Sequence, residues 1–202
     1  MRPMAKKKKT TLRIIPQNWL DPYNFKADFP HPEYPLEVDI GSGKGRFLAV
    51  RSAKFPEINF LGIERQLIRI NSSGRRCERA GRENVRLFRM EGFYAISRMM
   101  PSDYVSNYYF FFPDPWPKAR HENNRLFNPA FMDALHRTLI DGGGLHIATD
   151  HLPYFEEIHA LLKSDNARFE EIEAFQPDDE ERTDFELIFS HKEIGRCSFR
   201  KI

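Results

Sequence analysis

The stretch LEVDIGSGKGRFLAV, residues 36–50, decides the fold class of this chain. Its first part, LEVDI (36–40), is a short and mostly apolar run of the kind that forms a buried strand. A glycine-rich turn follows, in which Gly41 and Gly43 lack the side chains that would keep a ligand away from the backbone. A helix is then predicted over residues 45–54. Strand, glycine turn and helix in this order are typical of the first unit of a nucleotide-binding α/β domain.

The same alternation continues along the chain. Four more short apolar runs predict strands, at residues 58–64, 84–88, 108–112 and 146–149. Helices are predicted at residues 66–80, 93–100, 128–140 and 152–164. Strands that are apolar throughout, instead of alternating apolar with polar, are covered on both faces of their sheet. The pattern therefore predicts an α/β fold with a doubly wound, mostly parallel sheet and helices on both faces.

Length and composition fit one compact domain, since the chain has 202 residues of which 41% are hydrophobic. Residues 1–35 carry a run of four lysines followed by five prolines, so we expect a basic, extended N-terminal arm there and the domain over residues 36–202. No apolar stretch approaches the roughly 20 residues that cross a bilayer, and the N-terminus lacks the apolar run of a secretory signal. We expect a soluble, cytoplasmic protein.

The spacing of cysteines, histidines and charged residues further limits the classes of protein that this chain could belong to. Cys77 and Cys197 lie far apart and the seven histidines form no ligand motif, so neither a metal site nor a disulfide framework is expected. The net charge is only +2, yet eight arginines stand between residues 65 and 89 against two glutamates. Such a patch is typical of a face that binds a polyanion such as RNA, or simply of a solvated helix face.

Carboxylates stand at the ends of successive predicted strands. Asp39 lies in the first strand, and Glu64 ends the second, 23 residues after Gly41. An acid at the second position can accept hydrogen bonds from both ribose hydroxyls of an adenosine group. Glu91 follows the third strand and could accept the adenine amine, or could be a plain surface glutamate. The glycine turn alone could be a tight connection, but together with Glu64 it indicates a nucleotide-type cofactor that Gly41 and Gly43 approach.

The sixth position of the turn helps to distinguish a dinucleotide cofactor from S-adenosylmethionine. A dinucleotide fingerprint has a third glycine there, whereas this chain has Arg46. S-adenosylmethionine has no phosphate to hold, and Asp39 suits the cationic amino group of its methionine tail. The pattern favours S-adenosylmethionine. An NAD-linked oxidoreductase remains an alternative because it shares the glycine turn and Glu64.

The loop FPDPWPKARHENNRL, residues 112–126, follows the fourth predicted strand. Its prolines stiffen the backbone and place Asp114 and Trp116 at the edge of the sheet, with Lys118 just beyond. One interpretation is a slot for guanine, in which Asp114 accepts hydrogen bonds from the base or cofactor and the basic residues hold phosphates. The alternative is a stiff turn without a ligand. For Trp116, packing is the favoured interpretation.

Five motifs, in this order, resemble the bacterial tRNA (guanine-N7)-methyltransferase family, a class I S-adenosylmethionine-dependent group. They are VDIGSGKG, FLGIE, FFPDPWPKARH, ATD at 148–150 and TDFE at 183–186. The likeness covers residues 36–202. It implies a seven-stranded, Rossmann-like sheet and transfer of a methyl group from S-adenosylmethionine to N7 of a guanine in the variable loop of tRNA. It leaves open whether the chain acts as a monomer or a homodimer.

The resemblance also implies roles for single residues. Four carboxylates match the cofactor-contacting positions of the family, and one of them, Asp114, also matches its catalytic position; the four are Asp39, Glu64, Glu91 and Asp114. The substrate-contacting positions match Lys118, Asp150, Thr183 and Glu186. Thr183-x-x-Glu186 is equally the signature of a capping box at a helix start.

The chain departs from the family pattern at three places. Asp39 stands where members usually have glutamate, Pro117 where they have histidine, and Asn123-Asn124-Arg125 where they have a more basic triplet. The last two changes would weaken contacts to RNA. Two further alternatives remain open: an amino-group methyltransferase, because Asp114-Pro115-Trp116 partly mimics its acidic motif, and a non-catalytic RNA-binding protein that uses the arginines alone.

Overall fold

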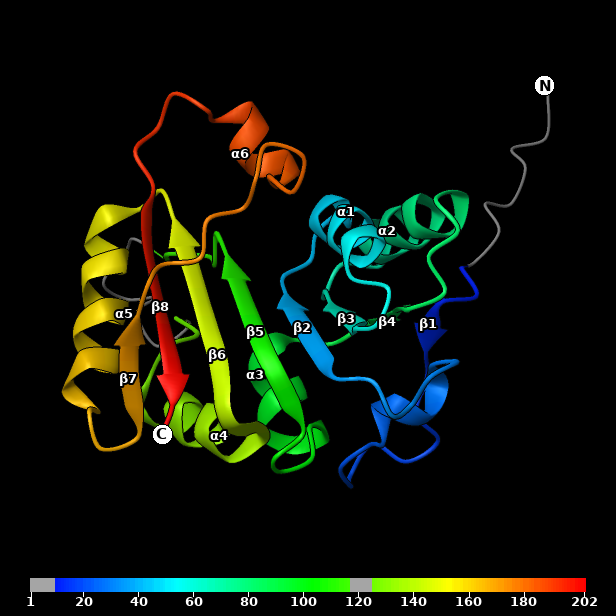
Figure 1. Cartoon of the computed structure of the whole chain (residues 1–202), viewed down its shortest axis with the longest axis horizontal. Coiled ribbons are helices and arrows are strands. Elements are labelled where there is room, and N and C mark those ends of the chain that lie inside the picture. The colour runs from blue at the N-terminus through cyan, green and yellow to red at the C-terminus, as the bar shows by residue number, and fades with distance from the viewer. Residues whose placement is uncertain (1–9, 117–124) are drawn as a thin grey trace.

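A computed structural model describes residues 10–116 and 125–202, which form one twisted sheet with helices on both faces (Figure 1). The strands are β1 (Arg13–Ile14), β2 (Leu36–Ile40), β3 (Asn59–Ile63), β4 (Val85–Phe88), β5 (Val105–Phe111), β6 (Leu139–Thr149), β7 (Phe169–Ile172) and β8 (Gly195–Lys201). Their order in the sheet is β1-β4-β3-β2-β5-β6-β8-β7. All neighbours from β1 to β6 pair in parallel, and β8 pairs antiparallel with both β6 and β7. The predicted α/β class is confirmed, with the two-residue β1 as an eighth strand.

The chain reverses its direction across the sheet between β2 and β5. It first runs outward through β3 and β4, and then returns to place β5 on the other side of β2. Because these strands are parallel, their carboxyl ends lie at one edge. In an open α/β sheet the crevice at such a reversal is where ligands bind.

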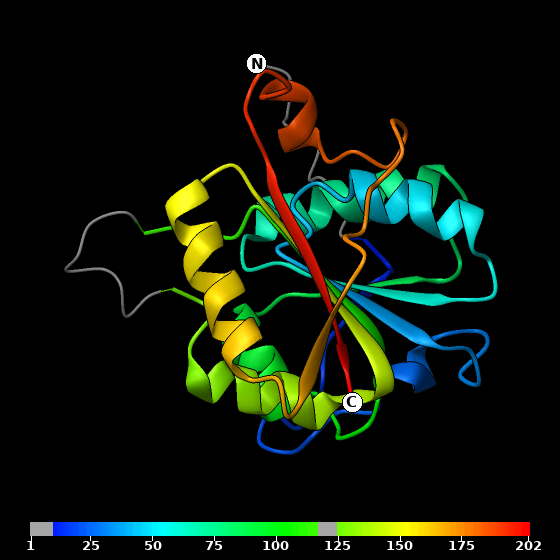
Figure 2. The same ribbon diagram turned by 60° about the vertical axis from the view of Figure 1, so that its left-hand side comes forward.

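The helices cover both faces as predicted. They are α1 (Arg46–Lys54), α2 (Leu67–Arg79), α3 (Gly92–Tyr94) with a π-helical turn at Ala95–Met99, α4 (Pro129–Thr138), α5 (Leu152–Ser164) and α6 (Asp184–Ile188). Buried residues of α1 and α2 pack on one face of the sheet, and those of α4, α5 and the π turn pack on the other (Figure 2). Within the described residues, no helix is long and apolar enough to cross a membrane.

Local chemistry explains two helix starts. Asn128 caps α4 by accepting a hydrogen bond from the backbone N–H of Phe131 at 3.0 Å, and Pro129 begins the helix. His151 caps α5 in a similar way, because its Nδ1 accepts from the N–H of Tyr154 at 3.1 Å. The helix predicted over residues 93–100 is instead a short α-helical turn followed by the π turn.

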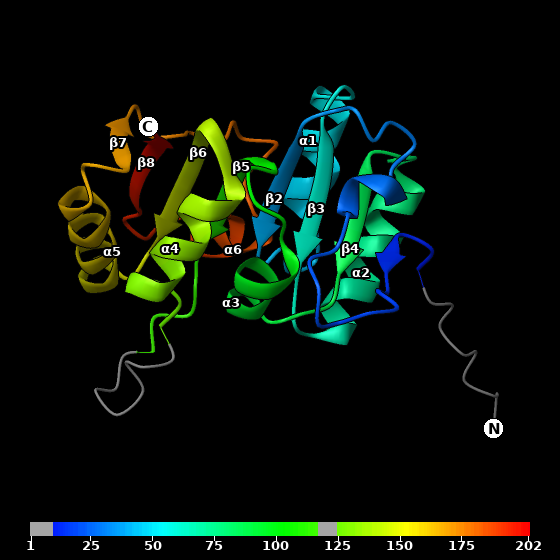
Figure 3. The ribbon, with the colours of Figure 1, turned by 90° about the horizontal axis from the view of Figure 1, so that it is seen from below.

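The segment before β2 packs against the sheet, where the sequence predicted an extended arm over residues 1–35. β1 pairs with β4, and Figure 3 shows its dark blue arrow beside β4. Ile14, Phe25 and Phe29 are buried in the main core, and Phe25 belongs to the 3-10 helix Phe25–Asp28. Apolar burial of these three side chains outweighs the tendency of the prolines toward an open chain. Residues 1–9, with the lysine run, lie outside the described residues.

Candidate active site

Two adjoining depressions lie at the carboxyl ends of the central strands. The larger has a volume of about 640 Å³ and is lined by Glu64, Glu91 and Asp114, which follow β3, β4 and β5. The smaller, of about 230 Å³, is lined by Asp39 and the glycine turn after β2, and on its other side by α6. Both are lined by four of the same residues: Gly41, Arg69, Phe111 and Phe112. The four strand-end carboxylates that the sequence singled out therefore surround one composite hollow.

The glycine turn gives this hollow a bare floor. Gly41 and Gly43 have φ values of +78° and +55°, in the left-handed region that favours glycine. A Cβ added to Gly41 would meet no atom within 4 Å, so the space above it is open to a ligand. Gly45 serves the fold instead, because a Cβ there would lie 2.0 Å from Oγ of Ser73 on α2.

Ser42, between those glycines, was not predicted as a site residue. Its Oγ is buried and has no hydrogen-bond partner within residues 10–116 and 125–202, although the residue lines the smaller depression. A buried hydroxyl without a partner costs free energy, so it favours binding of a polar ligand. Its position inside the glycine turn was the only sequence signal.

Glu64, with the carboxyl of Asp39 beside it, makes the hollow electronegative. Both carboxyls are buried, and burial together with the charge of Glu64 raises the pKa of Asp39 to about 8. The guanidinium of Arg69 pairs with Glu64: its Nη1 lies 3.6 Å from Oε2 of Glu64, and its side chain is half exposed. Glu64 also accepts the backbone N–H of Gln66 at 2.7 Å. A ligand with a positive charge and hydroxyl donors would fit this pair.

Glu91 has a structural task besides facing the larger depression. Its two carboxylate oxygens accept the backbone N–H groups of Phe93 and Tyr94, each at 2.9 Å, and so cap the start of α3. A carboxylate has about four acceptor positions, which leaves room for an amine donor as well. The capping and the ligand-binding interpretations are compatible.

The loop after β5 holds Asp114 at the rim of the larger depression. Phe112 and Trp116, on either side of it, have φ values of +57° and +43°, which are uncommon for residues other than glycine. Such conformations persist only where surrounding contacts impose them. One contact comes from Arg125, whose Nε donates to the carbonyl of Pro115 at 3.0 Å. Trp116 is half-buried and lines the depression, and Lys118 lies outside the described residues.

The late substrate positions divide into two groups. Thr183 lines the smaller depression, and with Glu186 it forms a complete capping box: each side chain accepts the backbone N–H of the other residue, at 3.1 and 2.9 Å. Glu186 is buried and pairs with Arg196 of β8. Asp150 lines neither depression and pairs with Lys192. The geometry brings Thr183 to the hollow but not Glu186 or Asp150.

The fold and this carboxylate-lined hollow are those of a Rossmann-like α/β domain. Two solved structures share the fold: the aminoglycoside resistance methyltransferase NpmB1 has a TM-score of 0.57 and 14% identity, and covers 88% of this chain and 90% of its own. An rRNA methylase from Streptococcus thermophilus has a TM-score of 0.55 and 14% identity, with 89% and 92% covered. At this identity the likeness speaks for the fold alone.

Sequence comparison identifies the family. Residues 33–193 match the model of a family described as putative methyltransferase. The tRNA (guanine-N(7)-)-methyltransferase of Nitrosococcus oceani is 36% identical over 170 residues, which are 82% of this chain and 71% of that protein. The same enzyme of Halorhodospira halophila is 38% identical over 136 residues, which are 67% of this chain and 58% of that protein. The chain belongs to the tRNA (guanine-N7)-methyltransferase family, whose methyl donor is S-adenosylmethionine.

Proposed function

We propose that this chain transfers a methyl group from S-adenosylmethionine to N7 of a guanine in the variable loop of tRNA. The observation that carries the proposal is the ring of four carboxylates from four adjacent strands around one hollow, in a chain whose relatives are named for this reaction. Those carboxylates are Asp39, Glu64, Glu91 and Asp114. The floor between them is glycine.

The residues present fit the cofactor in charge and shape. Asp39 would hold the cationic amino group of the methionine tail in the smaller depression, above the open backbone of Gly41 and Gly43. Glu64 would accept the ribose hydroxyls, and Glu91 the adenine amine. Bound S-adenosylmethionine supplies a methyl group on a positively charged sulfur. Its two cationic groups suit the electronegative hollow.

The protein's part in the reaction is mostly positioning. Guanine N7 has an in-plane lone pair, so no residue has to remove a proton before it attacks. Positive charge builds up on the purine during transfer, and the carboxylate of Asp114 is the group that would stabilise it while holding the base. Asp114 is therefore our candidate for the catalytic residue.

Contacts to tRNA would come from the rim of the hollow. Arg65 and Arg69 line the larger depression and are exposed, and the Arg89 guanidinium donates to the backbone carbonyl of Arg65 at 3.2 Å. We assign these three arginines to phosphates of the RNA, since each neutralised phosphate releases counterions. Thr183 and Lys118 remain candidates for substrate contact. Asp150 would reach the substrate only if its pairing with Lys192 opened, and we assign Glu186 to the start of α6.

Substrate and class also suggest where and how the protein works. Because tRNA is the substrate, we propose a cytoplasmic location. The protein would act there as a monomer or a homodimer, with tRNA as its macromolecular partner.

The test is incubation of unmodified tRNA with labelled S-adenosylmethionine, followed by mass spectrometry of the nucleosides. We expect 7-methylguanosine, and any other methylated nucleoside would refute the assignment. The variant Asp114→Ala should lower turnover far more than it weakens binding of S-adenosylhomocysteine. Calorimetry with NADH and S-adenosylhomocysteine separates the methyltransferase from an oxidoreductase. Failure to bind any adenosyl ligand would favour an RNA-binding protein without catalysis.

A further inference from the structure

An acidic segment leads into α6 and is held by basic side chains of α1 and α2. Residues 178–184 read DDEERTD, and the sequence pattern gave no function to residues 178–182 of this segment. Four basic residues contact this segment: Lys54 pairs with Asp178, Arg51 with Glu181 at 3.1 Å, Arg76 with Asp184 at 3.0 Å, and Arg46 donates to the carbonyl of Arg182 at 2.9 Å. The segment is thereby bound to α1 and α2, which lie about a hundred residues or more before it in the sequence.

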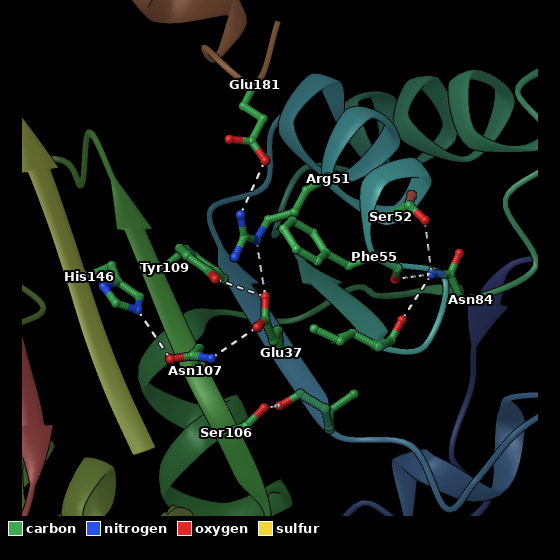
Figure 4. Close-up of polar contacts among 12 residues, drawn as sticks. Glu37, Arg51, Ser52, Phe55, Asn84, Ser106, Asn107, Tyr109, His146 and Glu181 are labelled. Carbon is green, nitrogen blue, oxygen red and sulfur yellow. Dashed lines mark hydrogen bonds and ion pairs between the residues drawn. The ribbon is translucent and has the colours of Figure 1, made fainter. Parts of the chain in front are cut away.

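One of these contacts differs from the rest because it is buried. Arg51 lies between Glu181 and Glu37 of β2 (Figure 4), and the side chains of these three residues are 12%, 6% and 4% exposed. Its Nε donates to Glu37 at 3.1 Å while its Nη1 donates to Glu181, so the two edges of one guanidinium serve two carboxylates. Removing one partner of a buried ion pair leaves the other charge buried without compensation, which is strongly destabilising. Loss of Glu181 should therefore disturb the structure around Arg51.

The guanidinium of Arg51 is fixed in place by its surroundings. Its Cζ lies 4.6 Å from the ring centre of Phe55, 5.0 Å from that of Phe175 and 5.1 Å from that of Tyr109. Glu37 is held in turn by Asn107 at 2.9 Å and by the Tyr109 hydroxyl at 2.8 Å. Arg51 on α1 and Glu37 on β2 are thus held firmly in place. Glu181, the third member of the contact, lies on the segment that connects β7 to α6.

Glu181 stands three residues before α6, the helix that forms one wall of the smaller depression. The N-cap Thr183 lines it, together with Asp184, Phe185 and Ile188 of the helix. The Phe185 ring also lies 4.6 Å, centre to centre, from the ring of Phe112, whose left-handed backbone leads into the Asp114 loop. A shift of this wall would therefore change both the cofactor side and the base side of the hollow.

We propose that Arg51 and Glu181 are positioning residues that hold the α6 wall against the glycine turn, so that the affinity for the methyl donor depends on a pair that does not touch it. The inference rests on the proposed function, since it takes the smaller depression as the place of the methionine tail. The other three contacts of the segment are more exposed than this one, so solvent screens them more and they contribute less.

The test compares Glu181→Ala with Glu180→Ala in the full chain. Glu180 is the neighbouring carboxylate, but it is exposed and pairs only loosely with Lys54, whose Nζ is 3.8 Å away. Loss of a hydrogen bond to a charged group should weaken S-adenosylhomocysteine binding about tenfold in Glu181→Ala, whereas Glu180→Ala should bind like the unchanged protein. In turnover, the KM for S-adenosylmethionine should rise by the same factor with kcat changed much less. A general loss of folding would lower kcat as well.

A conservative variant and a second readout complete the design. Glu181→Gln keeps an oxygen that can accept from Arg51, so it should restore most of the affinity. Hydrogen exchange of the backbone amides of residues 184–189 should speed up in Glu181→Ala and stay unchanged in Glu180→Ala. Equal affinity and equal exchange in the two alanine variants would overturn the proposal. If the unchanged protein bound no adenosyl ligand, the proposed methyltransferase function would be wrong. Unchanged hydrogen exchange in Glu181→Ala would separately show that the Arg51–Glu181 pair does not hold α6 in place.

Discussion

Asp39 should make ligand binding depend on pH in a range where aspartate normally does not titrate. Burial and the neighbouring charge of Glu64 raise its pKa to about 8 in the protein without ligand. The cationic amino group of the ligand needs the ionised carboxylate. At pH 7 only about one carboxyl in ten is ionised, so binding must drive off a proton in most molecules, at a cost of roughly 1.4 kcal/mol.

The magnitude follows from this pKa. Below pH 8 the affinity should fall as the ionised fraction falls, and above it the affinity should level off. S-adenosylhomocysteine, which carries the same amino group, should bind about 50-fold more weakly at pH 6 than at pH 8. At pH 7 each binding event should release close to one proton.

Titration calorimetry in two buffers of different ionisation enthalpy measures both the affinity and the released protons. Asp39→Asn is the control, since it keeps the shape of the side chain but cannot ionise. It should bind more weakly at pH 8 and lose most of the pH dependence. Equal affinity at pH 6 and pH 8 in the unchanged protein, with no proton released at pH 7, would refute the reasoning.

The remaining predictions concern stability and substrate binding. A raised carboxyl pKa in the folded state means that stability falls as pH rises from about 4 to 8, so Asp39→Asn should stabilise the protein at pH 7 by a few kcal/mol, on the order of 4, as denaturant unfolding would show. Gly45→Ala should lower stability by more than about 1 kcal/mol, because its Cβ would meet Ser73 at a left-handed position; an unchanged melting temperature would contradict this. Thr183→Ala should lower stability by about 1 kcal/mol by removing the cap of α6, and an unchanged free energy of unfolding would contradict this. Arg69→Ala should weaken tRNA binding and reduce its salt dependence by about one ion, and an unaltered salt slope would exclude a phosphate contact.

The central part of the fold could be predicted because its strands are buried on both faces. Continuous apolar runs located β2, β3, β4 and β5 to within a few residues, and alternation with helices set the parallel order. β6 begins seven residues before its predicted start, because Gly142, Gly143 and Gly144 were not expected inside a strand. β7 and β8 were missed, since their charged side chains hide the apolar face that antiparallel pairing buries.

The site was predictable where it depended on strand ends and unpredictable where it depended on distant pairing. Asp39, Glu64, Glu91 and Asp114 follow from the parallel sheet alone, because all its strands end at one edge. Whether Glu186 faces a ligand or the protein depends on Arg196, which comes from a strand that the pattern did not indicate. The orphaned hydroxyl of Ser42 likewise requires knowledge of every neighbour.

The seam between β2 and β5 is the one place where the two halves of the sheet meet, and the ligand hollow opens directly above it. Glu37 joins these halves below the hollow, accepting from Asn107 and Tyr109 of β5 while it belongs to β2. A sliding of β2 against β5 would stretch these hydrogen bonds before it could widen the hollow. The side-chain bonds of Glu37 therefore reinforce the backbone pairing of β2 and β5, which fixes the separation of the glycine turn from the Asp114 loop.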